Sequence, residues 1–495
     1  MTRTQRMTLV AAILGSAIAT IDGTVVNVAL PAIERDLGGG LQVQQWVANA
    51  YLLALGSLLL IGGSLGDIYG ERRIFALGAG GFGVFSLACA LAPTSEALIA
   101  ARALQGVAGA LLVPSSLAMI VAAFSARERA AAIGAWTAWG AIASLVGPFA
   151  GGLIVDRLSW RWIFALNLPL VGLTLVLVRS AVAPTRGPTG RRVDYLGAVL
   201  CALGLAGVVF ALIEQPRYGW SSPAIAVPLV GGIAAFAGFL AYERRAAQPM
   251  LRLELFARRN FAVGNAETLA MYAGLGVAFF FLSIFLQQVA GYTALEAGLA
   301  TLPVTIGMFV LSRRFGALAD RYGPRLFMGV GPLVAGAGLL LLLRTGIETS
   351  YISDVLPGLL VFSLGLSTTV APLTAAVLAD ADETDAGIAS AINNAVARVA
   401  GLVGVSVVGL VAARTLVGDT FAPNDSSVRA FHEVVAICAV LLAAGGVLGL
   451  LGIVNPRRPI EAEACSGGQL YGVPEPAAVP RVALATVSDG AAREA

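Results

Sequence analysis

The feature that most constrains this chain is a succession of long apolar segments with short polar connections between them. A bilayer core of about 30 Å is crossed by about 20 apolar residues in a helix. Within lipid, a helix satisfies all of its own backbone groups. We therefore predict an all-α integral membrane protein with fourteen transmembrane helices. The predicted spans are 8–30, 44–65, 74–93, 97–124, 130–155, 162–180, 195–213, 222–242, 261–288, 296–312, 326–343, 355–379, 386–412 and 431–454.

The charge content agrees with this interpretation. Charged residues make up 12% of the chain, against roughly 25% in soluble domains. So few charges cannot cover a water-facing surface of this size, so most of the surface is expected to face the lipid bilayer. The net charge of +3 provides no reason to expect a nucleic-acid partner.

The arginines predict the orientation. All 32 basic residues are Arg, a bias typical of a GC-rich bacterial genome. If the N-terminus is cytoplasmic, 23 arginines fall in cytoplasmic segments and 7 in outside segments. This asymmetry follows the positive-inside rule. We expect a multi-pass protein of the bacterial plasma membrane with both termini cytoplasmic.

One short segment occurs twice in the chain, far apart in the sequence. Residues 63–73 read GSLGDIYGERR and residues 316–326 read GALADRYGPRL, and six positions match at a constant offset of 253. Both copies fall between two spans on the same side, which predicts a parallel repeat. Glycines allow tight turns, so we interpret the copies as cytoplasmic hinges; the alternative is two similar surface turns. The hinge candidates are Gly63, Asp67, Gly70 and Arg72, and their counterparts Gly316, Asp320, Gly323 and Arg325.

These copies carry G-x-L-x-D-x-x-G-x-R, which resembles the hallmark motif of the major facilitator superfamily. The resemblance extends over residues 8–454. Further segments resemble motifs of its fourteen-spanner drug:proton antiporter branch. They are IDGTVVNVALP (21–31), RALQGVAGA (102–110), GPFAGG (147–152), SWRWIFALNLP (159–169) and FLQQVAGYTALEAGLATLP (285–303).

The resemblance implies two six-helix halves plus two inserted helices. The first half would be 1–180, and 181–260 would hold the inserted helices and a cytoplasmic connector. The second half would be 261–454, with a disordered cytoplasmic tail at 455–495. Some cation-exporting relatives carry an acidic residue within the tenth span, whereas here that span has only Glu296 at its outer edge.

Ionisable residues inside spans are costly, and each is a functional candidate. At 1.5 Å per residue, Asp22 lies about 21 Å from the cytoplasmic side and Arg102 about 8 Å from the outer side. These are the same depth in a core of about 30 Å, so the two can meet if helices 1 and 4 are neighbours, as the resemblance implies. Burial favours the neutral form of a carboxyl and a nearby Arg favours the charged form. Such a group can load and release protons, although a helix-packing hydrogen bond is the alternative role.

Three more residues complete the candidate set for proton coupling and the substrate cavity. Glu267 lies within the ninth span and is either a coupling carboxyl or a structural one, while Asn27 and Gln105 stand in the first- and fourth-helix motifs. Arg398 is an embedded cation that we interpret as part of a polar packing seam.

The fifth-helix motif consists of Gly147, Pro148, Gly151 and Gly152. Proline removes a backbone donor and bends a helix, and glycines allow a second helix to approach closely. A bendable seam suits rocking halves, and ordinary small-residue packing is the alternative.

The sequence holds no Walker loop, no H-E-x-x-H and no G-x-S-x-G, so we predict no catalytic residues, no metal site and no cofactor. Energy would then come from a proton gradient. We predict a monomeric antiporter that exports small amphiphilic drugs, toxins or self-made metabolites. The alternatives are a transporter of a nutrient or lipid, and a membrane sensor that transports nothing.

Overall fold

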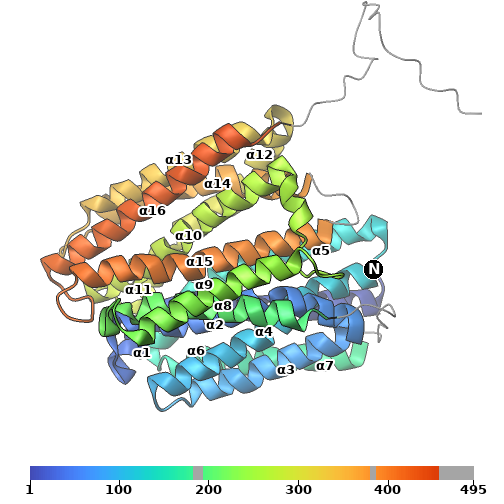
Figure 1. The fold of residues 1–495 in the computed structure, drawn as a ribbon, viewed down its shortest axis with the longest axis horizontal. Coiled ribbons are helices and arrows are strands. Elements are labelled where there is room, and N and C mark those ends of the chain that lie inside the picture. The colour runs from blue at the N-terminus through green and yellow to red at the C-terminus, as the bar shows by residue number, and fades with distance from the viewer. Residues whose placement is uncertain (182–192, 380–385, 456–495) are drawn as a thin grey trace, which may run out of the picture. The chain divides into compact units, whose positions relative to one another are not determined.

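The computed structural model describes residues 1–181, 193–379 and 386–455 (Figure 1). Within these residues, fourteen helical segments are long and apolar enough to cross a membrane, which confirms the predicted number. Four of them combine two helical elements in continuation: α6 with α7, α11 with α12, α13 with η2, and η3 with α14. Of the predicted tail 455–495, only Asn455 lies within the described residues.

The helices follow one another with short connections. In the first part they are α1 (Arg3–Leu37), α2 (Gly40–Tyr69), α3 (Glu71–Ala90), α4 (Ser95–Ala123), α5 (Ala126–Arg157), α6 (Arg161–Ala165), α7 (Asn167–Ala181), α8 (Tyr195–Tyr218) and α9 (Pro223–Glu243). A connector with the 3₁₀ helix η1 (Leu253–Ala257) follows. The second part holds α10 (Arg259–Gln288), α11 (Ala294–Ala300), α12 (Leu302–Tyr322), α13 (Pro324–Leu340), η2 (Leu341–Arg344), η3 (Tyr351–Val355), α14 (Leu356–Ala379), α15 (Ala386–Thr415) and α16 (Asp425–Gly452).

The predicted span 296–312 was too short. The structure continues this span to Tyr322, with Arg313 and Arg314 exposed on the helix. Arginine is a good helix former, so the helix continues through these two residues although they are polar. The helix ends where Gly323, with a φ of 89°, takes the chain out of the helical region.

The same helix pairings occur in both parts of the chain. α1 packs against α5 and α7, as α10 packs against α15 and α16. α4 contacts α2 and α3, as α14 contacts α12 and α13. The fold therefore consists of two six-helix halves with equivalent packing, plus α8 and α9.

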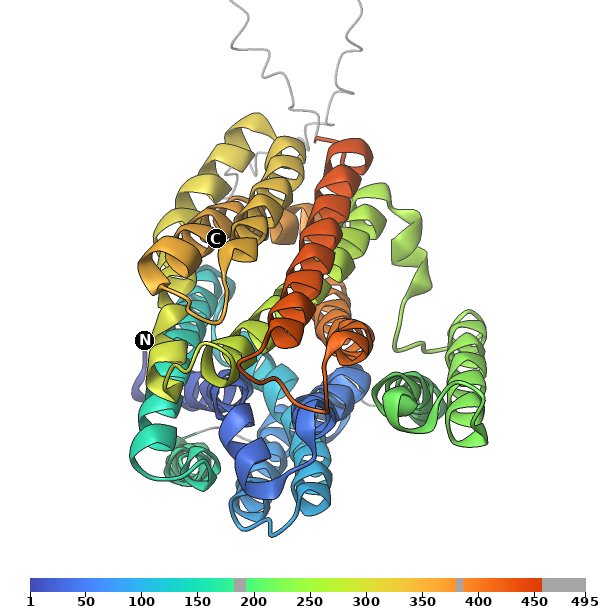
Figure 2. The ribbon, with the colours of Figure 1, turned by 90° about the vertical axis from the view of Figure 1, so that its left-hand side faces the viewer.

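The two inserted helices lie beside the two halves. α8 contacts α2 of the first half and α15 of the second, and α9 packs on the far side of α8 (Figure 2). α8 and α9 meet through glycines: a Cβ added to Gly207 would lie 2.9 Å from the Cα of Gly232. Small residues at such a contact allow the two backbones to approach closely.

The two repeat copies form equivalent turns. Gly70 joins α2 to α3 with a φ of 92°, and Gly323 joins α12 to α13 with a φ of 89°. Each glycine N–H is donated to a carbonyl four residues earlier, in Gly66 and Ala319 respectively. Only glycine adopts this φ without strain. The N-terminus and the α12–α13 turn lie at the same end of the ribbon (Figure 1), as a parallel repeat requires.

Candidate ion-coupling site

A buried carboxylate in α1 is the centre of the most connected polar network in the described residues. Asp22 Oδ2 accepts a hydrogen bond from Arg102 Nη1 at 2.5 Å. Asp22 Oδ1 accepts from Gln105 Nε2 and from Asn167 Nδ2, each at 2.9 Å. All three partners are donors, so these contacts fit the ionised carboxylate, which only accepts.

Four helices position this network. Arg102 and Gln105 are three residues apart in α4 and therefore share a face. Asn167 is the first residue of α7, directly after the break that separates it from α6. In α3, the Ser86 hydroxyl oxygen lies 2.9 Å from Gln105 Nε2 and 3.3 Å from Asn167 Nδ2, so it accepts from both amides.

The Arg102 guanidinium makes further contacts beside the one to Asp22. Arg102 Nε donates to the Val47 carbonyl at 3.1 Å and Nη1 donates to Gln105 Oε1 at 2.6 Å. Its central carbon lies 4.4 Å from the centroid of the Tyr51 ring. Arg102 is 1% exposed and Asp22 is 2% exposed. A buried pair of this kind is costly to break, because removal of one partner leaves an uncompensated charge.

The network continues toward the second half. Tyr51 in α2 and Arg398 in α15 interact electrostatically. The Cβ of Arg398 lies 3.6 Å from the position that a Cβ would take on Gly56 of α2. Asp22, Arg102 and Tyr51 are therefore linked within the first half, and Arg398 of the second half packs against α2 at Gly56.

The structure brings three of the five predicted cavity residues together. The expected contact of Asp22 with Arg102 is present, and Gln105 joins it. Glu267 lies elsewhere, in α10, where it is fully buried against α16 near Gly445 and Gly449. Within the described residues, neither Glu267 carboxyl oxygen meets a hydrogen-bond donor.

The fifth candidate lies at a contact between the halves. Asn27 is half-buried in α1, and its backbone carbonyl accepts a hydrogen bond from Ser283 of α10 at 3.1 Å. The sequence did not indicate that Ser86 and Asn167 belong to the Asp22 network. Asn167 stands in the segment SWRWIFALNLP, and its position as a polar residue within a span could have identified it as a candidate. Nothing in the sequence besides its hydroxyl group distinguished Ser86.

The hydrogen bonds between the two halves gather at one end. Most of them involve the C-terminal part of α1 or the N-terminal part of α2, which lie at the end away from the N-terminus. They include Ser283 Oγ to Asn27 O, Gln287 Nε2 to Val28 O, Gln45 Nε2 to Val405 O and Asn49 Nδ2 to Ser406 Oγ, between 2.9 and 3.1 Å. In this conformation, the halves are therefore joined at the end opposite the N-terminus.

The α5 glycines lie at two helix contacts near that end. A Cβ on Gly151 would lie 2.9 Å from a Val25 methyl of α1, and one on Gly152 would lie 2.5 Å from the Leu295 Cα of α11. Gly147 likewise faces Thr24 of α1. The predicted close approach is thus observed, and it joins α5 both to its own half and to the second half.

Pro148 takes part in the same junction, since Gly298 of α11 packs against its backbone carbonyl. The acidic side chain of Asp156, at the end of α5, accepts hydrogen bonds from the backbone N–H groups of Ala294 and Leu295 at 3.0 and 2.9 Å. Asp156 thereby caps the first turn of α11, where acceptors are favoured. This contact across the halves was not predicted.

The repeated arginines bind equivalent helix ends. Arg72 Nη2 donates to the Arg179 carbonyl in α7 at 3.1 Å, and Arg325 Nε donates to the Leu450 carbonyl in α16 at 2.6 Å. α7 and α16 are the last helices of the two halves, and carbonyls in a final turn lack partners within the helix. Each arginine therefore ties the α2–α3 or α12–α13 turn to the end of its own half.

The remaining hinge candidates lie around these turns. Gly63 packs near Pro114 of α4 and Gly316 near Ala371 of α14, at 3.7 and 3.5 Å from an added Cβ. Asp67 is half-buried and Asp320 is exposed. The carboxyl groups thus differ between the copies, whereas the glycines and arginines have equivalent surroundings.

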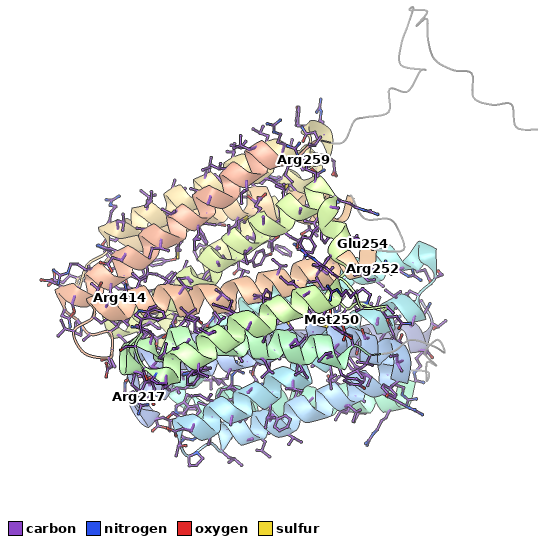
Figure 3. All side chains as sticks on the ribbon, in the orientation of Figure 1. Arg217, Met250, Arg252, Glu254, Arg259 and Arg414 are labelled. Atoms are coloured by element: carbon purple, nitrogen blue, oxygen red, sulfur yellow. The ribbon has the colours of Figure 1, made fainter. Side chains whose placement is uncertain are left out.

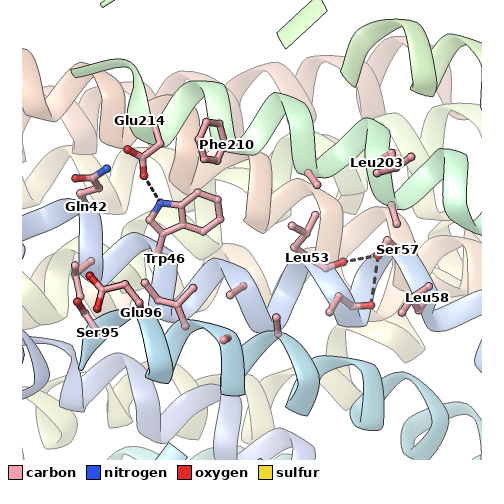
Figure 4. A pocket seen from close by; sticks show the side chains of 18 of the residues that line it. Gln42, Trp46, Leu53, Ser57, Leu58, Ser95, Glu96, Leu203, Phe210 and Glu214 are labelled. Carbon is pink, nitrogen blue, oxygen red and sulfur yellow. Dashed lines mark hydrogen bonds between the residues drawn. The ribbon is translucent and has the colours of Figure 1, made fainter. Parts of the chain in front are cut away.

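Two pockets flank the inserted helices, and neither borders Asp22 or Arg102. One, of about 660 Å³, lies between α2, α4 and α8, where Trp46 Nε1 donates to Glu214 Oε1 at 2.8 Å (Figure 4). The other, of about 380 Å³, lies between α2, α8, α9, α10 and α15 and includes Asn265. Both are lined mainly by apolar side chains.

Two equivalent helical halves, with a charged network buried in one of them, define a membrane transporter of the two-half type. Sequence comparison agrees with this class: a sequence model of the Major Facilitator Superfamily matches residues 12–405 and 268–470. The chain belongs to this superfamily.

Similar proteins align over most of the chain. It is 34% identical to the multidrug resistance protein Stp of Mycobacterium tuberculosis (strain CDC 1551 / Oshkosh), over 93% of this chain and 86% of Stp. It is 35% identical to a probable actinorhodin transporter of Streptomyces coelicolor, over 82% of this chain and 72% of the relative. It is 37% identical to the puromycin resistance protein pur8 of Streptomyces alboniger, over 81% of each chain.

Solved structures share the fold. The peptide transporter POT, solved in complex with sulfate, gives a TM-score of 0.64 at 16% identity and covers 91% of this chain and 94% of its own. A D-xylose–proton symporter gives 0.62 at 14% identity, with 91% and 98% covered. At these identities the likeness concerns the fold alone.

Proposed function

We propose that this protein is a proton-coupled antiporter that exports small amphiphilic compounds such as drugs, toxins or self-made metabolites. The relatives named for multidrug resistance, an actinorhodin transporter and puromycin resistance support export and this substrate class. The observation that carries proton coupling is the Asp22–Arg102 pair, the one buried ion pair within the described residues.

The contacts of Asp22 suggest how a proton acts. The ionised carboxylate accepts from Arg102, Gln105 and Asn167. A proton on either oxygen would compete with one of these donors, so binding it requires a contact to open. Arg102 then loses its counter-charge in a buried site, which is unfavourable unless the surroundings rearrange.

The rearrangement has a route to the other half. Arg102 also donates to Val47 of α2 and lies over the ring of Tyr51, which interacts with Arg398. A change at Asp22 therefore acts on α1, α2 and α4, and Arg398 of α15 packs against the same helix α2 at Gly56. Glu267 is the second candidate for proton binding, since its buried carboxyl meets no donor in the described residues.

We further propose that the protein lies in the bacterial plasma membrane with both termini cytoplasmic, works as a monomer, and uses the proton gradient without a cofactor or catalytic activity. Arg252 and Arg259 lie at the opposite end from Arg217 and Arg414 (Figure 3), in agreement with the arginine asymmetry. In that orientation the hydrogen bonds between the halves are at the outer end, so this conformation would admit substrate from the cytoplasm.

The test uses the purified full-length chain in proteoliposomes with an imposed pH gradient. The probes are puromycin and a lipophilic fluorescent dye, and pH is followed on the opposite side with a trapped indicator. Exchange of probe against protons, abolished by an uncoupler, is the expected result. Probe movement in the same direction as protons would favour a nutrient symporter, and no movement of either probe would count against drug export.

A further inference from the structure

Two carboxyl groups face each other where the inserted helices meet the connector. Asp194 precedes α8 and caps it, because its Oδ1 accepts a hydrogen bond from the Gly197 N–H at 2.9 Å. Glu243 is the last residue of α9, and its Oε2 accepts from the Leu251 N–H of the connector at 2.9 Å. Glu243 is only 3% exposed. One oxygen of each group is thus committed to a backbone N–H.

The other two oxygens lie close together. Asp194 Oδ2 and Glu243 Oε1 each lie 2.5 Å from the position that a Cβ would take on Gly197. They are therefore separated by no more than twice that distance. Glycine at position 197 makes room for this approach.

Within the described residues, neither of these two oxygens meets a hydrogen-bond donor, and neither carboxyl takes part in an ion pair. The other titratable groups that face the pair are Tyr242 on α9 and Cys201 on α8. α2 packs against this end of the inserted pair through Ile61.

Two ionised carboxylates in such a position repel each other, and one shared proton removes the conflict. It also creates a charge-assisted O–H···O⁻ hydrogen bond, which is shorter and stronger than a neutral one. A multivalent cation is a poorer occupant, since Ca²⁺ takes 6–8 oxygen ligands and only two carboxyls converge here.

We propose that Asp194 and Glu243 form a proton-binding site in which one proton is shared between Asp194 Oδ2 and Glu243 Oε1, and that this proton fastens the connector to the inserted helices. Glu243 holds Leu251 directly, and the connector leads from α9 into α10, the first helix of the second half. Figure 3 shows its residues Met250, Arg252 and Glu254 at this end of the molecule. Loss of the proton would leave two anions and loosen the junction.

The first test is independent of transport. Infrared difference spectra of the full chain in lipid nanodiscs are recorded as the pH is raised, for the wild type, Glu243→Gln and Asp194→Asn. The wild type should lose a protonated-carboxyl C=O band that both variants lack. Asn is as good an N-cap as Asp, so Asp194→Asn keeps the test available if the other variant misfolds. The control is Glu254→Gln, which removes an exposed connector carboxyl and should keep the band.

The second test measures the connector itself. Trypsin cleaves after Arg, and the connector holds Arg244, Arg245 and Arg252. At each pH, the cleavage rate of the wild type at these arginines is divided by the rate of Glu243→Gln, which corrects for the pH dependence of trypsin itself. This ratio should rise several-fold from mildly acidic to alkaline pH. The Gln amide can donate to Asp194 at any pH, so the variant should stay fastened. Glu254→Gln should follow the wild type.

Identical spectra and cleavage ratios in the wild type and both pair variants would overturn the proposal. A band that emerges only after a chelator is added would also overturn it, because a metal ion would then occupy the site. An effect of the pair on transport rests on the proposed antiport function: each variant should flatten the pH profile of efflux. Normal spectra with no efflux would leave the proton site standing and refute the antiporter.

Discussion

The substitution Asp22→Asn tests the coupling site most directly, because it removes the charge and the proton-binding carboxylate of Asp22 while preserving the shape of the side chain. Asp22 accepts hydrogen bonds from Arg102, Gln105 and Asn167. Asn offers one acceptor oxygen in place of two. If that oxygen keeps Gln105 and Asn167, the Asn amide faces the Arg102 guanidinium, donor against donor.

The magnitude follows from burial. Removal of one partner from a buried ion pair costs about 3–5 kcal/mol. Arg102 keeps its bonds to Val47 and Gln105, so we expect the lower end, about 3 kcal/mol. That corresponds to roughly a hundredfold change in an equilibrium. Since Asn cannot bind the proton at all, proton-driven efflux should fall at least about a hundredfold, the change expected from the ion pair alone.

The assay is probe efflux and proton movement in proteoliposomes, with protein insertion measured by recovery in the membrane fraction. Asp36→Asn is the matched control: Asp36 lies in the same helix and pairs with Arg161 at 2.6 Å, but both side chains are partly exposed to solvent, unlike Asp22 and Arg102. Exposed pairs contribute little, so this variant should retain transport. Proton-coupled efflux at the wild-type ratio in Asp22→Asn would refute the reasoning.

Three further substitutions test other parts of the proposal. Gly152→Leu should abolish exchange, because the added side chain prevents the two halves from closing against each other at Leu295, at a packing cost of about 1–3 kcal/mol. The control is Gly140→Leu on the same helix, where an added Cβ meets nothing within 4 Å; it should transport normally, and equal activity of the two variants would contradict this prediction. Arg325→Ala loses an exposed hydrogen bond to the last turn of α16, so thermal unfolding should show a loss below about 1.5 kcal/mol, and turnover should fall more than KM rises. Glu267→Gln should keep the wild-type number of protons moved per probe molecule. A lower number in this variant would show that Glu267 takes part in proton coupling.

Much of the fold was predictable because a membrane protein of this class consists of helices that cross the bilayer one after another, each with a length set by the bilayer thickness. Segment length and apolarity identified the fourteen spans, and the repeat at 63–73 and 316–326 predicted two equivalent halves, because spans have fixed lengths and alternate in direction. The depths of Asp22 and Arg102 followed from the rise per residue, and their contact is present. The end of the tenth span was wrong because apolarity marks the edge of the lipid and not the end of the helix.

Lateral neighbours could not be predicted in this way. Counting along a span places a residue in depth, but many residues share each depth, and only helix packing selects those that touch. Ser86 and Asn167 joined the network, Glu267 packed against α16 instead, and Asp194 met Glu243 across two helix ends for this reason. The sequence by itself determined the number of spans, the repeat and the depth of the buried charges. Only the tertiary structure decided which charges meet. A hydrogen bond depends on the distance between atoms on different helices, and the order of residues along one helix does not give that distance.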